Sequence, residues 1–247
     1  MGKSTLQEKL VALYPRLNGY FVSGFIVHAP IEYQNAAGET RRARTELDIL
    51  AVRFPFNREP ERVVLPSTYL DVSNSHIDIV IGEVKGGLKE RLQFNRGLRE
   101  NPDAIESILG WIGILDDEKT KSIIGSIESI LSTQNEPDYS KFSEYIVPKE
   151  ISKNNIRFRT IIFAPDRPKP SLGQIRYVYG GEIIDFVWRC LCPEESRVDC
   201  ETKYDYGLWG NYEELVRYFK RVDRKPNSLD KLYVSFTCAN SKINNDN

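Results

Sequence analysis

The sequences TELDILAV at residues 45–52 and IGEVKGG at residues 81–87 give the strongest indication of the architecture. Each contains a run of aliphatic and β-branched residues, which is typical of a strand buried on both faces of a sheet. Each also carries charges in or at the end of the apolar run, Glu46 and Asp48 in the first and Glu83 and Lys85 in the second. Burying a charge costs free energy unless it is paired or bound to a metal. The stretches therefore predict strands that carry a functional site.

The alternation of side chains along a strand predicts which of these residues face the same way. Glu46 and Asp48 share a face of the first strand. Glu83 and Lys85 share a face of the second strand, and Asp78 lies on the opposite face of that strand. If the strands are neighbours, Asp48 and Glu83 converge on one hard divalent cation, because carboxylate oxygens are what Mg²⁺ and Mn²⁺ prefer. The metal would activate water and Lys85 would stabilise developing charge, so the set has the parts for phosphodiester hydrolysis.

Asp48, a separation of 35 positions and then Glu83-Val84-Lys85 resembles the signature of the PD-(D/E)XK, or restriction-endonuclease-like, nuclease superfamily. The resemblance implies a three-layer α/β/α fold with a central mixed sheet. It also implies that Asp48, Glu83 and the backbone carbonyl of Val84 bind Mg²⁺ or Mn²⁺, with Lys85 catalytic. The sequence departs from the signature at Leu47, which stands where the signature has proline, although that proline is absent in many members. The alternative is a surface set of salt bridges on ordinary strands.

Three further residues are candidates by their placement. Members of the superfamily often carry an acidic residue on the first helix, for which Glu8 is the candidate, and some carry a polar residue on the helix after the lysine, for which Gln93 is the candidate. The first stretch is similar to the Glu-x-Asp form of the aspartate strand. Glu46 is therefore either a carboxylate that supports the metal ligands or a partner of Arg44.

Basic residues gather beside the two strands. Residues 85–99 and residues 156–180 each hold five basic residues and one acidic residue, whereas residues 100–140 hold nine acidic residues and two lysines. Cations near the site suit binding of a phosphate backbone, although any single basic run is more often an ordinary solvated face. The candidate nucleic-acid contacts are Arg42, Arg44, Lys89, Arg91, Arg96 and Arg99.

Periodicity extends the plan over the whole chain as one domain, residues 1–247, with a core at about 5–192, a helical insertion and a C-terminal helical and strand extension at about 193–239. Residues 134–140 are predicted to form a linker and residues 240–247 a frayed tail. The predicted strands cover 20–33, 45–54, 77–85, 157–163, 174–179 and 231–236. The predicted helices cover 5–17, 98–115, 119–131, 181–192 and 212–221.

Composition narrows the class of protein. The 34 basic and 35 acidic residues nearly balance, and a hydrophobic content of 40% is typical of a globular chain. No run reaches the roughly 18 apolar residues of a membrane span, and the N-terminus has no apolar signal core. Four cysteines without zinc-ligand spacing are expected to be reduced thiols, which favours the cytoplasm.

The leading hypothesis is a Mg²⁺-dependent endonuclease that hydrolyses phosphodiester bonds of DNA, as part of a defence, restriction or repair system. The alternative is a catalytically silent nucleic-acid-binding or scaffold subunit of the same fold. A third reading, a hydrolase of small phosphate esters, suits the open basic flanks less well. The sequence leaves open the choice between DNA and RNA, the strand preference, and whether the protein acts as a homodimer or in a larger complex.

Overall fold

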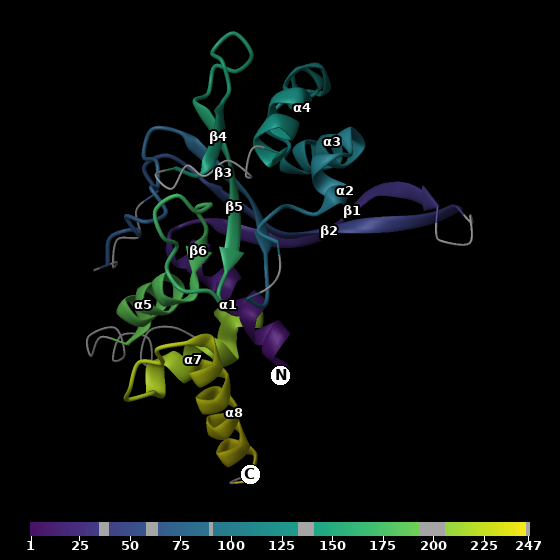
Figure 1. Ribbon diagram of the computed structural model, residues 1–247. Helices are drawn as coiled ribbons and strands as arrows, with labels where there is room; N and C mark the ends of the chain where they lie inside the picture. Colours follow the sequence, from purple (N-terminus) through teal and green to yellow (C-terminus); the bar gives the residue numbers. More distant parts are fainter. Residues whose placement is uncertain (35–39, 58–63, 89–90, 133–140, 193–205, 246–247) are drawn as a thin grey trace.

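The protein is built on a six-stranded mixed sheet in the order β1-β2-β3-β5-β4, with β6 beside β5 (Figure 1). The computed structural model describes residues 1–34, 40–57, 64–88, 91–132, 141–192 and 206–245. The first three strands form an antiparallel meander, and β3 runs parallel to β5. The strands are β1 (Phe21–Gln34), β2 (Thr40–Arg53), β3 (Ile77–Val84), β4 (Ser143–Ile146), β5 (Ile156–Ala164) and β6 (Val178–Tyr179).

Helices cover both faces of the sheet and make three layers (Figure 1). One face carries α1 (Lys3–Leu17) and α5 (Gly180–Leu191), and α7 (Glu213–Arg221), α8 (Leu229–Asn245) and the 3₁₀ segment η2 (Tyr206–Tyr212) pack against these helices on the same side. The other face carries α2 (Arg96–Arg99), α3 (Pro102–Ile112) and α4 (Asp117–Ser132). The predicted α/β/α architecture with a central mixed sheet is therefore confirmed. No helix in the described ranges is long and apolar enough to cross a membrane.

Alternate side chains of the central strands pack into two separate hydrophobic cores, one on each face of the sheet. Val80 and Phe163 pack with the helices on the α1 side, whereas Ile79, Ile81 and Ile162 pack with α3 and α4. This alternation is the period of two expected of a strand that is covered on both faces. It explains why apolar residues occur at consecutive positions in these strands, as at Ile79–Ile81 of β3 and Ile161–Phe163 of β5.

Several details differ from the sequence-based prediction, and the strand predicted over 174–179 is confined to β6 at Val178–Tyr179. The strand predicted over 231–236 is wrong, because this segment belongs to α8, which also runs through most of the predicted frayed tail. Leu229, Leu232 and Phe236 are buried at helical spacing, a stripe that a six-residue window does not reveal. The helix predicted over 98–115 ends and restarts, since α3 begins at Pro102. Strand β4 was missed, and the predicted linker at 134–140 lies outside the described residues.

Candidate active site

Asp48 and Glu83 meet where β2 and β3 separate. The antiparallel ladder pairs Ile49 with Gly82, and these two carboxylates follow directly beyond that last pair. Oδ2 of Asp48 accepts a 2.8 Å hydrogen bond from the backbone N–H of Val84. A side chain thus occupies the position that a backbone carbonyl of β2 would hold if the ladder continued. The prediction that the two carboxylates lie on adjacent strands is confirmed.

A β-bulge in β2 gives Asp48 its place in this gap. Between two register pairs, β2 has one residue more than β1, so Asp48 and Ile49 together stand opposite Gly24. A Cβ atom at Gly24 would lie 2.7 Å from the carbonyl oxygen of Asp48, so glycine is required for this close approach. The bulge also shifts the alternation, since Leu47 and Leu50 pack into the same core although they are three positions apart. Bulges beside active sites commonly redirect a side chain in this way.

Glu83 is buried, and only one of its oxygens is paired. Oε1 accepts a 2.7 Å hydrogen bond from Nζ of Lys85, while Oε2 is buried and has no hydrogen-bond partner among the described residues. Burial raises the pKa of Glu83; the Lys85 ammonium and, more weakly, the backbone N–H of Asn95 oppose this shift, and the Asp48 carboxylate adds to it. Burial also raises the pKa of Asp48, against the opposing effects of the Val84 N–H and Lys85. Two neighbouring carboxyl groups with raised pKa values are unfavourable in their ionised forms, and a cation bound to both would stabilise those forms.

Glu8 and Glu46 flank this pair. Glu8 is exposed on α1, where Oε1 accepts a 3.1 Å hydrogen bond from the hydroxyl of Ser4, and Glu46 is exposed on β2. Both carboxylates lie near enough to add to the raised pKa of Asp48, after the larger effect of burial. Within the described ranges, no three His, Cys, Asp or Glu side chains form a group that could hold a metal ion. The candidate site is therefore a pair of carboxylates with outlying acidic neighbours.

The residues around the loop after β3 differ from the prediction. Gln93 is not on a helix, because α2 begins only at Arg96. Sequence reasoning missed Gln7, which is buried on α1; a Cβ atom at Gly86 would lie 3.4 Å from both polar atoms of its side-chain amide. The signal that could have identified Gln7 is its place on the apolar stripe of the helix, beside Leu6 and Leu10.

The donor set suits a hard divalent cation. Mg²⁺ is usually bound in proteins through one or two carboxylates, with water and substrate phosphates completing its shell. The unpaired buried Oε2 of Glu83 and the Asp48 carboxylate provide such a pair, and the backbone carbonyl of Val84 is the third candidate ligand. Three ligands from histidine or cysteine would indicate zinc instead.

The basic residues after β3 are partly engaged with an acidic neighbour. Arg91 is exposed, and the Arg96 side chain is 82% exposed, with Nε 2.5 Å from a carboxylate oxygen of Glu100. Arg99 contacts Glu100 at 3.1 Å and donates a hydrogen bond to the backbone carbonyl of Phe94. Lys89 lies outside the described residues. Arg91 and Arg96 are therefore the better candidates for phosphate contacts.

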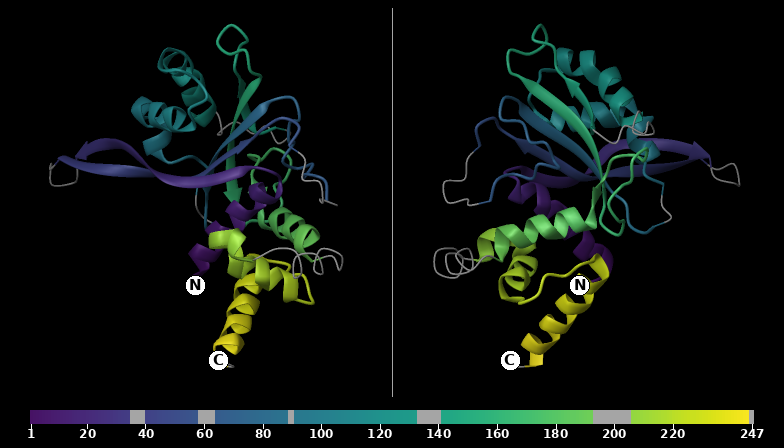
Figure 2. Two further views of the ribbon diagram at one scale, coloured as in Figure 1. Left: turned by 180° about the vertical axis from the view of Figure 1, so that it is seen from behind. Right: turned by 60° about the vertical axis from the view of Figure 1, so that its left-hand side comes forward.

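Arg42 and Arg44 lie on an arm of the sheet. The β1–β2 pair continues past the body of the molecule as a two-stranded ribbon, with Arg42 opposite Glu32 (Figure 2). β3 pairs only with the part of β2 from Ile49 to Arg53. The ribbon places both arginines away from the carboxylate pair along the same strand.

The second basic segment, residues 156–180, has mainly a structural role. Arg157 and Arg159 of β5 are buried, and both guanidinium groups bind the buried carboxylate of Asp78, at 3.0 and 2.6 Å for their closest contacts with Oδ2. The hydroxyl of Tyr20 donates a further 2.5 Å hydrogen bond to Asp78. These arginines are therefore not phosphate contacts, because both guanidinium groups are buried and paired with the carboxylate of Asp78. Asp78 is likewise a partner of arginine and not a metal ligand.

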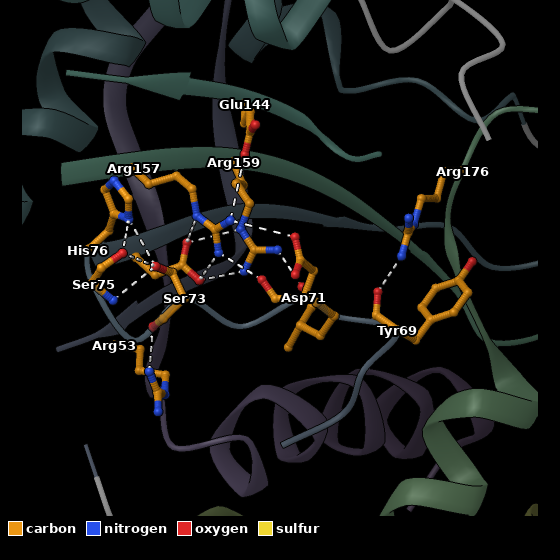
Figure 3. Close-up of polar contacts among 12 residues, drawn as sticks. Arg53, Tyr69, Asp71, Ser73, Ser75, His76, Glu144, Arg157, Arg159 and Arg176 are labelled. Atoms are coloured by element: carbon orange, nitrogen blue, oxygen red, sulfur yellow. Dashed lines mark hydrogen bonds and ion pairs between the residues drawn. The ribbon is translucent and has the colours of Figure 1, made fainter. Parts of the chain in front are cut away.

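Arg157 and Arg159, together with Arg53 and Arg176, hold a loop segment against the sheet. Four backbone carbonyls within Tyr69–Ser73, the clamped segment, each accept a hydrogen bond from a guanidinium group (Figure 3). The pairs are Arg176 with Tyr69 at 2.5 Å, Arg159 with Leu70 at 2.5 Å, Arg157 with Asp71 at 2.8 Å and Arg53 with Ser73 at 2.7 Å. Buried carbonyl groups need such partners, so the clamp allows a loop without regular structure to cover this end of the sheet.

Searches for similar proteins find no family model, no curated protein and no solved structure that matches this chain.

Proposed function

We propose that the protein is a metal-dependent endonuclease that hydrolyses phosphodiester bonds of DNA, with a restriction-endonuclease-like site and a role in defence, restriction or repair. The observation that carries the proposal is the meeting of Asp48 and Glu83 at the end of the β2–β3 ladder, with Lys85 in contact with Glu83. The raised pKa values of Asp48 and Glu83, which lie next to each other with Lys85, mark this point as a candidate functional site. The four cysteines do not have the spacing of a disulfide framework or a zinc site, which suits a reducing compartment, and we propose the cytoplasm.

Each of the three residues has a distinct role in this proposal. Asp48 and Glu83 would hold Mg²⁺ or Mn²⁺, which supplies water activation and charge neutralisation when bound. Lys85 now donates to Glu83, and a divalent cation at the carboxylates would compete for that contact. The ammonium group would then donate a hydrogen bond to the attacking water or to a phosphoryl oxygen in the transition state. Glu8 and Glu46 would add negative charge near the ligands.

The test compares single variants of the three residues with a control. Asp48→Ala and Glu83→Ala should abolish both metal binding by calorimetry and cleavage of plasmid, linear and single-stranded DNA. Lys85→Ala should still bind the metal but cleave on the order of 10²–10³ times more slowly, the typical effect of losing one transition-state donor. Glu118→Ala, which removes an exposed carboxylate from the first turn of α4, is the matched control and should be fully active.

The same assay separates the nuclease from the silent binding subunit. A nuclease of this kind cleaves with Mg²⁺ or Mn²⁺ and stops in EDTA. Cleavage that persists in EDTA, or a fully active Lys85→Ala protein, would reject the mechanism. DNA binding without cleavage under every metal condition would favour the binding subunit.

A further inference from the structure

We propose that a pocket beside Lys85 receives an unpaired nucleobase of the DNA strand that enters the candidate site; this inference rests on the proposed function. The pocket has a volume of about 520 Å³. Its lining residues are Leu88, Leu92, Arg167, Pro168, Gly173, Gln174, Ile175 and Tyr177.

Two loops that leave the sheet together form the pocket. The backbone N–H of Gly87 donates a 3.0 Å hydrogen bond to Oδ2 of Asp166, which ties the loop after β3 to the loop after β5. The next residue on each loop, Leu88 and Arg167, lines the pocket. Consecutive Cα atoms are 3.8 Å apart, so the Cα atom of Leu88 lies within about 11 Å of that of Lys85. The pocket is therefore next to the candidate site, at the carboxyl ends of two parallel strands, where α/β folds commonly bind ligands.

The walls of the pocket are largely apolar. The Leu88 side chain is 68% exposed, and Leu92 and Ile175 are partly exposed, so an apolar surface lies open to solvent here. The hydroxyl of Tyr177 donates to the carbonyl of Pro168 at 2.8 Å, which fixes the buried tyrosine in the wall. Apolar walls fit the two faces of a nucleobase.

Polar groups at the pocket match the edge of a base. Arg167 lines the pocket and brings the positive charge of a guanidinium group to it, which suits a phosphate next to the bound base. The amide oxygen of Gln174 accepts a 2.9 Å hydrogen bond from the backbone N–H of Ser171, and this contact fixes the orientation of its amide group. An apolar cavity with a few placed polar groups is the usual form of a site for a small planar ligand.

The size and position of the pocket select the occupant. Its volume falls within the range of about 300–1,000 Å³ that small-molecule sites have, which is enough for a nucleotide. A base that stays paired and stacked in a duplex cannot enter a pocket, so the occupant must come from a single strand, a frayed end or a flipped nucleotide. The proposal therefore predicts a preference for DNA with unpaired bases near the scissile phosphate.

The test measures binding of short single-stranded DNA in EDTA, so that no cleavage is needed. A single abasic position is moved along the strand, and the dissociation constant is measured for each strand. The exposed walls are mainly aliphatic, so an abasic position should lose burial of roughly 60 Å² of base surface and weaken binding on the order of 10-fold at one or two positions and little elsewhere. Leu88→Ser should remove this position dependence. Leu172→Ser is the matched control, since Leu172 is 86% exposed on the neighbouring loop and does not line the pocket.

The outcomes separate the pocket from the nuclease mechanism. Equal affinity for every abasic strand, or a Leu88→Ser protein with the wild-type position dependence, would overturn the pocket assignment even if Asp48→Ala abolishes cleavage. A position dependence that is lost only in Leu88→Ser would support the pocket even if no DNA is cleaved. In that case the proposed function fails, and a pocket for an unpaired base remains in a binding protein.

Discussion

Asp78→Asn is the change that most directly tests the buried ionic cluster under the clamped segment. The side chain of Asp78 is fully buried and accepts five hydrogen bonds, two from Arg157, two from Arg159 and one from Tyr20. Asparagine has nearly the same shape, so the substitution removes charge and one acceptor without opening a cavity.

The structure gives the size of the effect. Two of the five hydrogen bonds end on Oδ1 and three on Oδ2, so the new amide NH₂ group must face at least two donors. A hydrogen bond to a charged group contributes about 1.5–3 kcal/mol, which gives a loss of about 3–6 kcal/mol. Breaking a buried ion pair typically costs about 3–5 kcal/mol, in agreement. For a domain of this size, a loss of about 3–5 kcal/mol corresponds to a fall in Tm of about 6–20 °C.

The pH dependence has a defined sign. Burial works against ionisation of Asp78, but Arg159 and Arg157 outweigh it and lower the pKa of the carboxyl group in the folded protein. A group with a lowered pKa stabilises the fold fully above its unfolded value of about 3.9, and this stabilisation disappears as the pH falls through the folded value. The difference between wild type and Asp78→Asn should therefore be constant near neutrality and shrink below about pH 4.

The assay is urea unfolding followed by circular dichroism, with Asp71→Asn as control. Asp71 is 81% exposed and lies 3.8 Å from Arg157, so its loss should change the free energy of unfolding by less than about 0.5 kcal/mol. Asp78 precedes Glu83 by five residues, or about 17 Å along the strand, so cleavage per folded molecule should not change. If Asp78→Asn loses no more free energy of unfolding than Asp71→Asn, the account of the cluster is wrong.

Two further predictions concern the site. Gly24→Ala should lower the free energy of unfolding by about 1–3 kcal/mol, because the new methyl group would lie 2.7 Å from the carbonyl oxygen of Asp48. The displacement of Asp48 should also lower the rate of single-turnover cleavage about 10²-fold. Gly125→Ala is the control, since nothing lies within 4 Å of this position on α4, and it should raise the free energy of unfolding by about 0.5–1 kcal/mol. A Gly24→Ala protein with wild-type stability and activity would contradict the bulge argument. Arg91→Glu and Arg96→Glu should each weaken DNA binding for all sequences and lower the slope of log K against log salt by about 0.7–0.9, measured by fluorescence anisotropy. An unchanged slope would remove that arginine from the DNA-binding surface.

The central strands were predictable because their apolar runs are local signals. The same runs located Asp48 and Glu83, since a charge inside a buried strand is conspicuous in the sequence. The bulge at Asp48 was not predictable, because it is defined by the register with β1 and by the absence of a side chain at Gly24. Register between strands is not a local property of either strand.

The roles of the β5 arginines were hidden for a related reason. In the sequence, Arg157 and Arg159 alternate with Phe158, a pattern typical of a half-exposed strand. In the structure, β5 is buried along its whole length, and the parallel register sets Arg157 opposite Asp78 on β3. Only the pairing of strands far apart in the sequence shows that these charges have a buried partner.

The clamped segment has a consequence for the order in which the chain folds. Two of its carbonyls accept hydrogen bonds from arginines that lie 86 and 89 residues later in the sequence, and a third accepts one from an arginine 107 residues later. During synthesis, the meander of β1, β2 and β3 is complete long before β5 leaves the ribosome, and until then Asp78 and this loop have none of these partners. Contacts of such long sequence separation form late and slowly. Nascent chains that end before Arg157 should therefore expose this end of the sheet, and we expect them to depend on chaperones more than the full-length chain does.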